Sequence, residues 1–132
     1  MLLWRGKPKR KSKGELGRIS EEHAARYLTS KGYRLRERNY RAQAGEVDII
    51  AEHDGSLVFI EVKARSSDEH GAPIEAVTTW KQRRIVSVAN SYIRSHERRE
   101  RAMRFDVVEV FLNPTGRVEK INVIQGAFGV GR

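Results

Sequence analysis

The feature that most constrains the fold is the dipeptide Asp54-Gly55, which separates two apolar runs at residues 49–51 and 57–60. An Asp-Gly pair favours a two-residue turn, because both positions must accept positive φ angles. The flanking runs are partly β-branched, which is typical of strands. The pattern therefore predicts an antiparallel hairpin in which His53 faces Ser56.

That register predicts two carboxylates on one face of the hairpin. Counting outward pairs Ile50 with Phe59, Ile49 with Ile60, Asp48 with Glu61 and Glu46 with Lys63. Directly opposed side chains have Cβ atoms about 4.5–5.5 Å apart, and like charges placed there repel each other. A hard divalent cation would offset the repulsion, since Mg²⁺ is typically held by one or two carboxylates. The sequence thus predicts a site for Mg²⁺ or Mn²⁺ at Asp48 and Glu61, with Lys63 on the same face.

The ordinary alternative is a solvated outer face, on which alternating charges are common. The flanking residues argue against it, because both faces of the hairpin are expected to be covered. Ile50, Leu57 and Phe59 lie on the charged face, and the other face carries Val47, Ile49, Val58, Ile60 and Val62. Charges at the end of such a hairpin are costly unless they are paired or bind a metal. We therefore favour a functional site.

A helix is predicted over residues 13–30, between a Ser12–Glu15 capping box and Gly32. Glu21 shares its apolar stripe with Ala24, Ala25 and Leu28, whereas Glu22 lies four residues before Arg26 and is expected to pair with it. Glu21 is therefore the inward carboxylate and a candidate ligand for the metal or its waters. The alternative is a carboxylate at the core edge that pairs with an arginine.

The remaining pattern predicts five strands and a second helix. Strands are expected at residues 33–38, in the two arms of the hairpin around Asp54-Gly55, and at 103–112 and 117–125, with a basic connection at 38–45 and a helix from Thr78 or Thr79 to about Ser95. The order α-β-β-β-α-β-β indicates an α/β sandwich with a central mixed β-sheet flanked by helices, in which a crossover through the second helix makes two strands parallel. Residues 65–79 form a loop beside Lys63 that either closes over a substrate or serves only as a crossover.

Two polar residues are expected to point inward. Gln82 lies on the apolar stripe of the second helix and is a candidate for orienting water or phosphate, although a buried glutamine is more often satisfied by the backbone. Asp106 shares a strand face with Arg104 and is expected to pair structurally with a basic group. Lys81, Arg83 and Arg84 are expected to fan outward from the same helix.

The net charge of +9 is concentrated at the beginning of the chain. Residues 1–13 hold six basic and no acidic side chains, which leaves 20 basic against 17 acidic residues elsewhere. We expect this basic arm to be flexible and to neutralise nucleic-acid phosphates, or to act only as a solubilising tail. Residues 14–125 then form the domain and 126–132 a flexible tail. The predicted nucleic-acid contacts are Lys7, Lys9, Arg10, Lys11, Lys13, Arg41, Arg65, Lys81, Arg83 and Arg84.

Composition excludes several classes of protein. The chain has no cysteine, so thiolate zinc sites and disulfides are excluded. No apolar run reaches the roughly 18 residues of a membrane span, and the apolar start Met1–Trp4 is too short for a signal peptide. The four histidines show no metal-ligand spacing. We therefore expect a cytoplasmic protein without membrane association.

A set of short motifs along the chain carries a resemblance to a known family. The motifs are Gly17–Glu21 with Ala24 and Tyr27-Leu28, Gly32-Tyr33, Arg38–Arg41, Gly45–Asp48, Phe59–Arg65, Lys81–Arg84 and Arg104–Val107. Together they resemble the YraN-like family of small bacterial proteins over about residues 14–112. Asp48 with Glu61-Val62-Lys63 is also similar to the PD-(D/E)XK nuclease superfamily, which includes type II restriction enzymes and archaeal Holliday-junction resolvases. The chain departs from these patterns at Ser20, where the family usually has glycine, and at Val47, where the superfamily motif has proline.

The resemblance implies a restriction endonuclease-like fold and a Mg²⁺-dependent endonuclease that acts on DNA, with structured or branched DNA included. Asp48 and Glu61 would hold the metal, with the Val62 carbonyl and Glu21 as further ligands. Lys63 would position the attacking water, and Gln82 and Glu46 would support the site. The rival hypothesis is a non-catalytic nucleic-acid-binding module that keeps the same fold. A protein-interaction adaptor would need an exposed apolar patch, which the sequence does not show. The sequence leaves open whether the protein is a homodimer.

Overall fold

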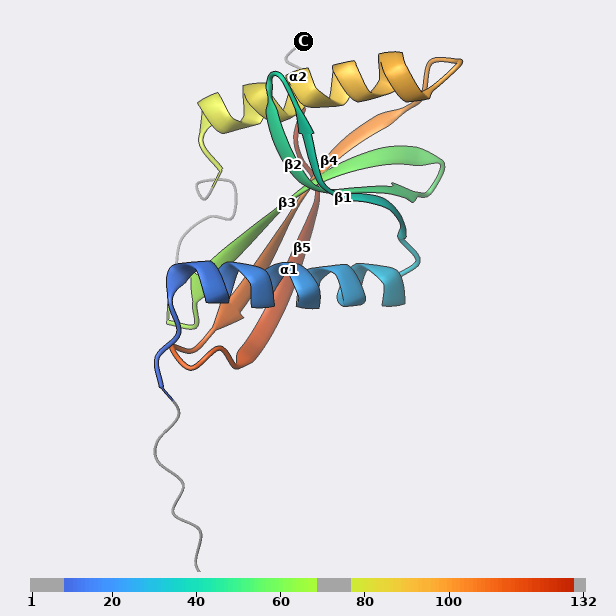
Figure 1. The fold of residues 1–132 in the computed structure, drawn as a ribbon. Helices are drawn as coiled ribbons and strands as arrows, with labels where there is room; N and C mark the ends of the chain where they lie inside the picture. Colours follow the sequence, from blue (N-terminus) through green and yellow to red (C-terminus); the bar gives the residue numbers. More distant parts are fainter. Residues whose placement is uncertain (1–8, 69–76, 130–132) are drawn as a thin grey trace, which may run out of the picture.

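A computed structural model, which describes residues 9–68 and 77–129, shows a five-stranded mixed sheet between two helices (Figure 1). The elements are α1 (Lys13–Ser30), β1 (Arg34–Ala42), β2 (Gly45–His53), β3 (Ser56–Ser66), α2 (Thr79–His96), β4 (Met103–Leu112) and β5 (Val118–Phe128). The strands lie in the order β1-β2-β3-β4-β5, with β3 parallel to β4 and the other neighbours antiparallel. The predicted fold class, element order and parallel crossover are confirmed.

The central hairpin forms as predicted near its turn. Asp54 and Gly55 have φ angles of 49° and 78°, the left-handed values that a type I′ turn requires. His53 pairs with Ser56, and the regular ladder continues to Ile49 and Ile60. It ends there, so the pairs expected further out, Asp48 with Glu61 and Glu46 with Lys63, are not part of the ladder.

The hairpin departs from simple alternation at Asp48. In β1, Asn39 has a φ angle of 52°, and it stands opposite Asp48 because Arg38 pairs with Ile49 and Tyr40 with Val47. Val47 consequently packs on the same side of the sheet as Ile50, and not beside Ile49 as alternation predicted. β1 also continues to Ala42, so the segment expected to be a connection at 38–45 is mostly strand.

The sheet separates two hydrophobic cores. Ala24 and Leu28 of α1 pack on the face that carries Ile49 and Ile60. On the opposite face, Tyr92 of α2 packs on Phe59, with their ring centroids 6.0 Å apart. Figure 1 shows the two helices on opposite sides of the strongly twisted sheet. Strands buried on both faces are typical of α/β folds, and β3 fits this pattern with four fully buried residues at 57–60.

Local capping sets where the helices begin. Ser12 and Glu15 form the predicted reciprocal capping box at the start of α1. Thr78 caps α2 by accepting a hydrogen bond from the Lys81 backbone N–H at 3.1 Å. Neither of the two helices that the described residues form is long and apolar enough to cross a membrane.

Contacts at both ends of the described chain join it to the sheet. The Lys11 backbone N–H donates to the Pro114 carbonyl at 2.8 Å, which joins the end of the basic arm to the β4–β5 turn. β5 continues past Gln125 to Phe128, whose ring stacks on Phe105 at 5.2 Å. Residues 1–8, the centre of the predicted loop at 69–76 and residues 130–132 lie outside the described part of the chain.

Asp106 forms the structural pair that was expected. It is fully buried and accepts hydrogen bonds from Arg104, at 2.8 and 2.9 Å, and from the Tyr33 hydroxyl, at 2.8 Å. The Gly126 backbone N–H adds a fourth bond at 3.0 Å. Burial and the bond to Asp106 raise the pKa of Tyr33 to about 12. This network fixes β4 to the residue before β1 and to the end of β5.

Candidate functional site

The predicted carboxylates Asp48 and Glu61 lie close together at the point where β2 leaves β3. The Val62 backbone N–H, which regular pairing would direct to a β2 carbonyl, instead donates to Asp48 Oδ2 at 2.8 Å. Glu61 is 8% exposed, low for a carboxylate. Burial raises the pKa of Asp48 to about 7, and the negative charge of Glu61 adds to the increase. The two groups are therefore electrostatically strained as a pair of anions.

Lys81 supplies the positive charge closest to this pair among the contacts of the described residues. Its Nζ lies 3.3 Å from Glu61 Oε2, and its charge opposes the rise in the pKa of Asp48. Lys81 stands in the first turn of α2, so the helix reaches over the end of β3 to the site. Lys81 was expected to point outward toward nucleic acid, and its side chain is 46% exposed, but its ammonium group contacts Glu61.

Glu21 and Glu46 extend the acidic cluster toward α1. Burial and the negative charge of Asp48 raise the pKa of Glu21, and Glu46 adds to the effect. With its amide nitrogen turned to the carboxylates, Asn39 donates to Glu21 Oε1 at 2.9 Å and to Glu46 Oε1 at 3.2 Å. Asn39 thus holds the two glutamates on either side of its left-handed backbone position. Glu22 forms its ion pair with Arg38, at 3.1 Å, and not with Arg26 as predicted.

The carboxylates of the site supply the hard oxygen donors that Mg²⁺ prefers. Within residues 9–68 and 77–129, no three His, Cys, Asp or Glu side chains converge closely enough to enclose a metal by themselves. Asp48 and Glu61 nevertheless offer hard oxygen donors whose mutual repulsion a cation would relieve. Mg²⁺ is commonly bound by one or two carboxylates while it keeps several waters. The pair therefore fits Mg²⁺ or Mn²⁺, with Glu21 placed on the side of Asp48 that faces α1.

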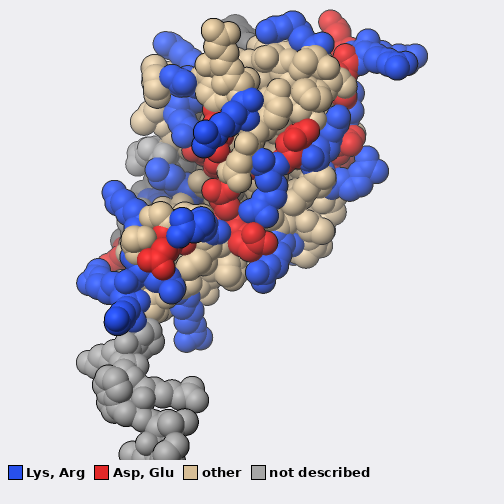
Figure 2. All heavy atoms as spheres, in the orientation of Figure 1, with Lys and Arg blue, Asp and Glu red and all other residues tan. Residues whose placement is uncertain are grey.

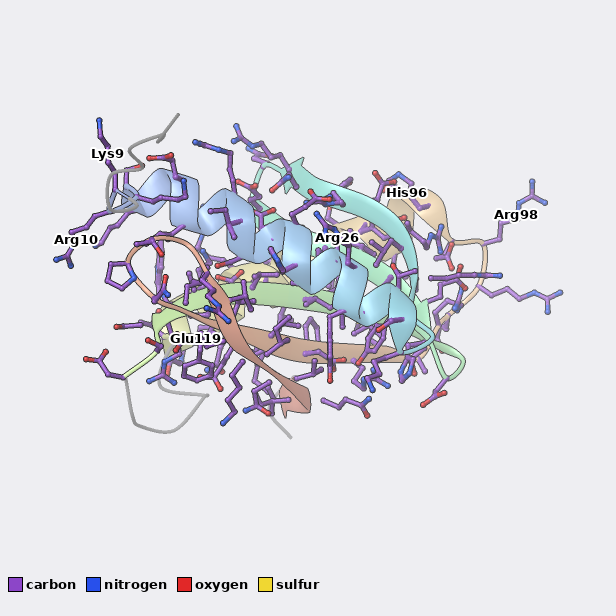
Figure 3. All side chains as sticks on the ribbon, turned by 90° about the horizontal axis from the view of Figure 1, so that it is seen from below. Lys9, Arg10, Arg26, His96, Arg98 and Glu119 are labelled. Carbon is purple, nitrogen blue, oxygen red and sulfur yellow. The ribbon has the colours of Figure 1, made fainter. Side chains whose placement is uncertain are left out.

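Lys63 lies on the same face of β3 as Glu61. Its side chain lines a groove of about 590 Å³. Lys63 is exposed and forms no ion pair with the described residues. The groove runs between the start of α1, the end of β3 and the β4–β5 turn, and is lined in part by Arg10, Lys11, Lys13, Glu61, Lys63 and Arg65. Three of the predicted phosphate contacts from the arm, Arg10, Lys11 and Lys13, thus border the same groove as Lys63. Figure 3 shows Lys9 and Arg10 at this end of α1 and Arg98 beyond the other end.

The other predicted nucleic-acid contacts differ in their surroundings. Arg65 forms an ion pair with the buried Glu109, and its side chain is only 9% exposed, so its charge is used inside the fold. Arg41 is highly exposed and lies 3.5 Å from Glu46. Arg84 covers the ring of Trp80, at 4.6 Å from the centroid. Arg83 is exposed, and Lys7 lies outside the described residues.

The Gln82 side chain is satisfied by the backbone, which is the ordinary alternative that the sequence left open. Its Nε2 donates to the Val77 carbonyl at 2.9 Å, just before the helix begins. The amide therefore secures the entry into α2. It positions Lys81 indirectly, because the two residues share the first turn.

Two residues with clear roles in the geometry were not recognised as such. Asn39 falls in segment 38–45, for which the sequence predicts a basic connection, although asparagine is among the few residues that tolerate a left-handed φ. Lys81 was assigned to the outer surface, since its pairing with a residue 20 positions away depends on where α2 crosses the sheet. In Figure 2, carboxylates gather in the middle of the visible face, between the regions of α2 and α1, with Lys and Arg side chains around them.

Comparison with known proteins places the chain in a bacterial family. A sequence model of the uncharacterised protein family UPF0102 matches residues 20–110. The chain is 43% identical over 121 residues to a UPF0102 protein of Caldanaerobacter subterraneus, covering 91% of this chain and 99% of the relative. It is 45% identical over 113 residues to a UPF0102 protein of Symbiobacterium thermophilum, with 86% and 95% covered, and 42% identical over 118 residues to one of Clostridioides difficile, with 89% and 97% covered. The YraN-like resemblance is thereby confirmed, and the chain belongs to the UPF0102 family.

Proposed function

We propose that this protein is a divalent-metal-dependent nuclease of the PD-(D/E)XK type that cleaves phosphodiester bonds in DNA. The observation that carries the proposal is the carboxylate pair of half-buried Asp48 and buried Glu61, which meets beside a basic groove that Lys63 lines. A fold has no structural need for two adjacent carboxylates of which one, Glu61, raises the pKa of the other, Asp48, and such pairs occur often at functional sites. The α/β sandwich with its parallel β3–β4 pair is compatible with the superfamily.

The proposed mechanism assigns a separate role to each side chain. Asp48, Glu61 and the Val62 carbonyl would hold Mg²⁺ or Mn²⁺, and Glu21 would bind it directly or through water. The ion would polarise the scissile phosphate and lower the pKa of an attacking water. Lys63 would orient this water in line with the leaving oxygen and stabilise the negative charge that develops on the phosphate. Arg10, Lys11 and Lys13 would hold the phosphates of the strand along the groove.

Lys81 favours a second candidate function. A lysine that already lies 3.3 Å from Glu61 partly neutralises the acidic pair without any metal. A module that only binds nucleic acid could keep this arrangement to fix the end of β3 to α2. In that case the groove would bind DNA, and the carboxylates would contribute nothing to turnover.

A cleavage assay separates the two functions. Purified protein, freed of metal with EDTA, is incubated with end-labelled single-stranded, duplex, flap and four-way DNA at increasing Mg²⁺ or Mn²⁺. The wild type and the surface control Glu119→Gln, whose position Figure 3 labels, should cleave at least one of these substrates only when metal is present. Asp48→Asn and Lys63→Ala should both lose cleavage.

Three outcomes would contradict the nuclease. Cleavage that persists in EDTA, or that Lys63→Ala retains at full rate, would rule out the proposed chemistry. DNA binding by the wild type without cleavage of any substrate would favour the binding module.

A further inference from the structure

Trp80 is the one large hydrophobic residue that is exposed among the residues the structure describes, with 65% of its surface accessible. Tyr92 of α2 and Phe59 and Phe105 of the sheet are, by contrast, buried. A single exposed hydrophobic side chain is common and by itself implies nothing. Trp80 differs because of what surrounds it: it lines a groove of about 540 Å³ together with Arg41, Ala42, Gln43, Gly45, Glu46, Lys81 and Arg84.

Arg84 contacts the Trp80 ring and also the β1–β2 turn, and so holds one face of the indole. The Arg84 guanidinium lies 4.6 Å from the Trp80 ring centroid, four residues along the same helix. Arg84 also lies against the backbone of Gly45, where a Cβ atom would come within 3.2 Å of Arg84 Nε. The arginine is therefore packed between the β1–β2 turn and the ring. This contact restricts the orientation of the indole while leaving most of its surface exposed.

The groove connects the indole to the carboxylate site. Trp80 directly precedes Lys81, whose Nζ lies 3.3 Å from Glu61. Glu46, on the other side of the groove, lies within hydrogen-bonding distance of the Asn39 amide that also reaches Glu21. The aromatic ring thus stands at the border of the site, on the α2 side. The groove that contains Lys63 opens between β3 and the start of α1.

We propose that Trp80 stacks against an unpaired base of a DNA strand whose phosphates are held by Arg41 and Arg84. Base stacking on an exposed aromatic ring, with cations along the backbone, is how single strands are commonly bound without sequence preference. Only an unpaired base can stack in this way, because both faces of a paired base are covered by its neighbours in the duplex. The inference rests on the proposed function and narrows its substrate class to single strands, flaps and branch points with unpaired nucleotides.

A protein partner would be the other use of an exposed tryptophan, since Trp and Arg are enriched at interface hot spots. The composition of the groove favours the nucleic acid. Apart from Trp80, Ala42 and Gly45, its lining consists of polar and charged side chains, most of them basic. The experiment nevertheless includes a measurement that detects a protein interface.

Binding is measured without metal, so the result does not depend on turnover. The chain has two tryptophans, so the variant Trp4→Phe makes fluorescence report Trp80 alone. Oligo(dT), oligo(rU) and a duplex of the same length are titrated in EDTA. We expect saturable quenching by the single strands and much weaker quenching by the duplex. Equal quenching by oligo(rU) would leave the stacking intact and extend the substrate class to RNA.

Variants at position 80 test whether the ring supplies affinity. Trp80→Ala should weaken binding of oligo(dT) about 5- to 150-fold, the range expected for loss of one stacked base, with little effect on the duplex. Trp80→Phe should restore most of the loss. The matched control is Tyr27→Ala on α1, which removes another surface aromatic that has a cation, Lys31, over its ring. Thermal unfolding of each variant confirms that it folds.

Several results would overturn the proposal. These are the absence of quenching by single strands, equal losses for single strand and duplex in Trp80→Ala, or an effect of Tyr27→Ala as large as that of Trp80→Ala. A change in sedimentation of Trp80→Ala with unchanged oligo(dT) affinity would assign the indole to a protein interface. A failure of the nuclease proposal would appear as absent cleavage with the binding pattern intact, so the two failures are distinguishable.

Discussion

Replacing Asp48 with asparagine should stabilise the metal-free protein, although it removes a half-buried carboxylate of the proposed site. Asparagine has nearly the same shape, and its side-chain oxygen can still accept the 2.8 Å hydrogen bond from the Val62 N–H. What the substitution removes is a negative charge that burial and Glu61 both disfavour. The change in the free energy of unfolding of this variant therefore reports the electrostatic cost of the site and not a change in packing.

The magnitude follows from the pKa of Asp48, which is about 7 in the folded protein against an ordinary value of 3.8. One pKa unit corresponds to about 1.4 kcal/mol, so the cost of ionising Asp48 in the fold is at most about 4 kcal/mol. Asp48 keeps some contact with solvent and shares the repulsion with Glu61, so we expect about half of this, or about 2 kcal/mol.

The pH dependence has a definite sign. Because the folded-state pKa of Asp48 is raised, its contribution to stability is fully present below pH 3.8 and is lost as the pH rises through about 7. Asp48→Asn lacks this loss. The difference in unfolding free energy between variant and wild type should therefore be close to zero at pH 4 and reach its full value by pH 8.

Urea denaturation in EDTA at fixed ionic strength, from pH 4 to pH 8, measures this difference. Glu119→Gln serves as the control, since neutralising an exposed carboxylate should change stability by less than about 0.5 kcal/mol. Saturating Mg²⁺ should then stabilise the wild type and not Asp48→Asn, by about 2.7 kcal/mol at 100 times the dissociation constant. A destabilised Asp48→Asn at pH 8, or a difference that does not grow with pH, would refute the electrostatic account of the site.

Further predictions address the cations around the site and the buried network. Lys63→Ala should lower any cleavage by about 100-fold or more and leave calorimetric metal affinity unchanged or stronger, because water positioning and charge stabilisation are lost together; equal losses of both would assign Lys63 to metal binding. Lys81→Met should increase affinity for Mg²⁺ in the same titration, since it removes the cation that competes for Glu61, and an unchanged affinity would place the metal elsewhere. Deleting residues 1–10 spares the Ser12 cap and should make the salt dependence of DNA affinity less steep, by up to about 3 in slope for its four basic residues on a single strand; an unchanged slope would show that the arm is only a tail. Tyr33→Phe should destabilise the fold by about 1–3 kcal/mol in urea, because buried Asp106 loses a donor, whereas a neutral effect would mean that water replaces the hydroxyl.

The sequence predicted the fold where local chemistry determines it. The Asp54-Gly55 turn sets the register of the central hairpin as far as Ile49 and Ile60, and Ser12 and Thr78 set where the helices begin. Beyond Ile49, the predicted residue pairs were wrong because the prediction assumed that side chains alternate regularly between the two faces of the sheet. The left-handed backbone at Asn39, opposite Asp48, breaks that assumption.

The sequence predicted the proximity of the two carboxylates, but it did not predict the partners of the basic side chains. Asp48 and Glu61 belong to one hairpin, so their proximity follows from short-range pairing even though the ladder itself ends before them. The partners of the basic side chains depend on tertiary packing: Arg65 meets Glu109 because β3 and β4 are parallel neighbours, and Lys81 meets Glu61 because α2 crosses the end of β3. Sequence periodicity can tell which face of a helix a lysine occupies, but not which carboxylate lies beneath that face.

The break in the β1–β2 pairing and the acidic cluster have a common physical origin. At Asn39 and Asp48 the two strands stop presenting alternate residues to alternate faces, so Val47 packs toward α2 and Ile49 toward α1. The irregularity lets the Asp48 side chain replace a backbone carbonyl as the acceptor of the Val62 N–H, and it lets the Asn39 amide reach both Glu21 and Glu46. A regular pair of strands would satisfy these backbone groups by itself. The irregular pairing instead directs side chains from α1, β2 and β3 to one place, which is the arrangement that a metal-dependent site on this sheet would require.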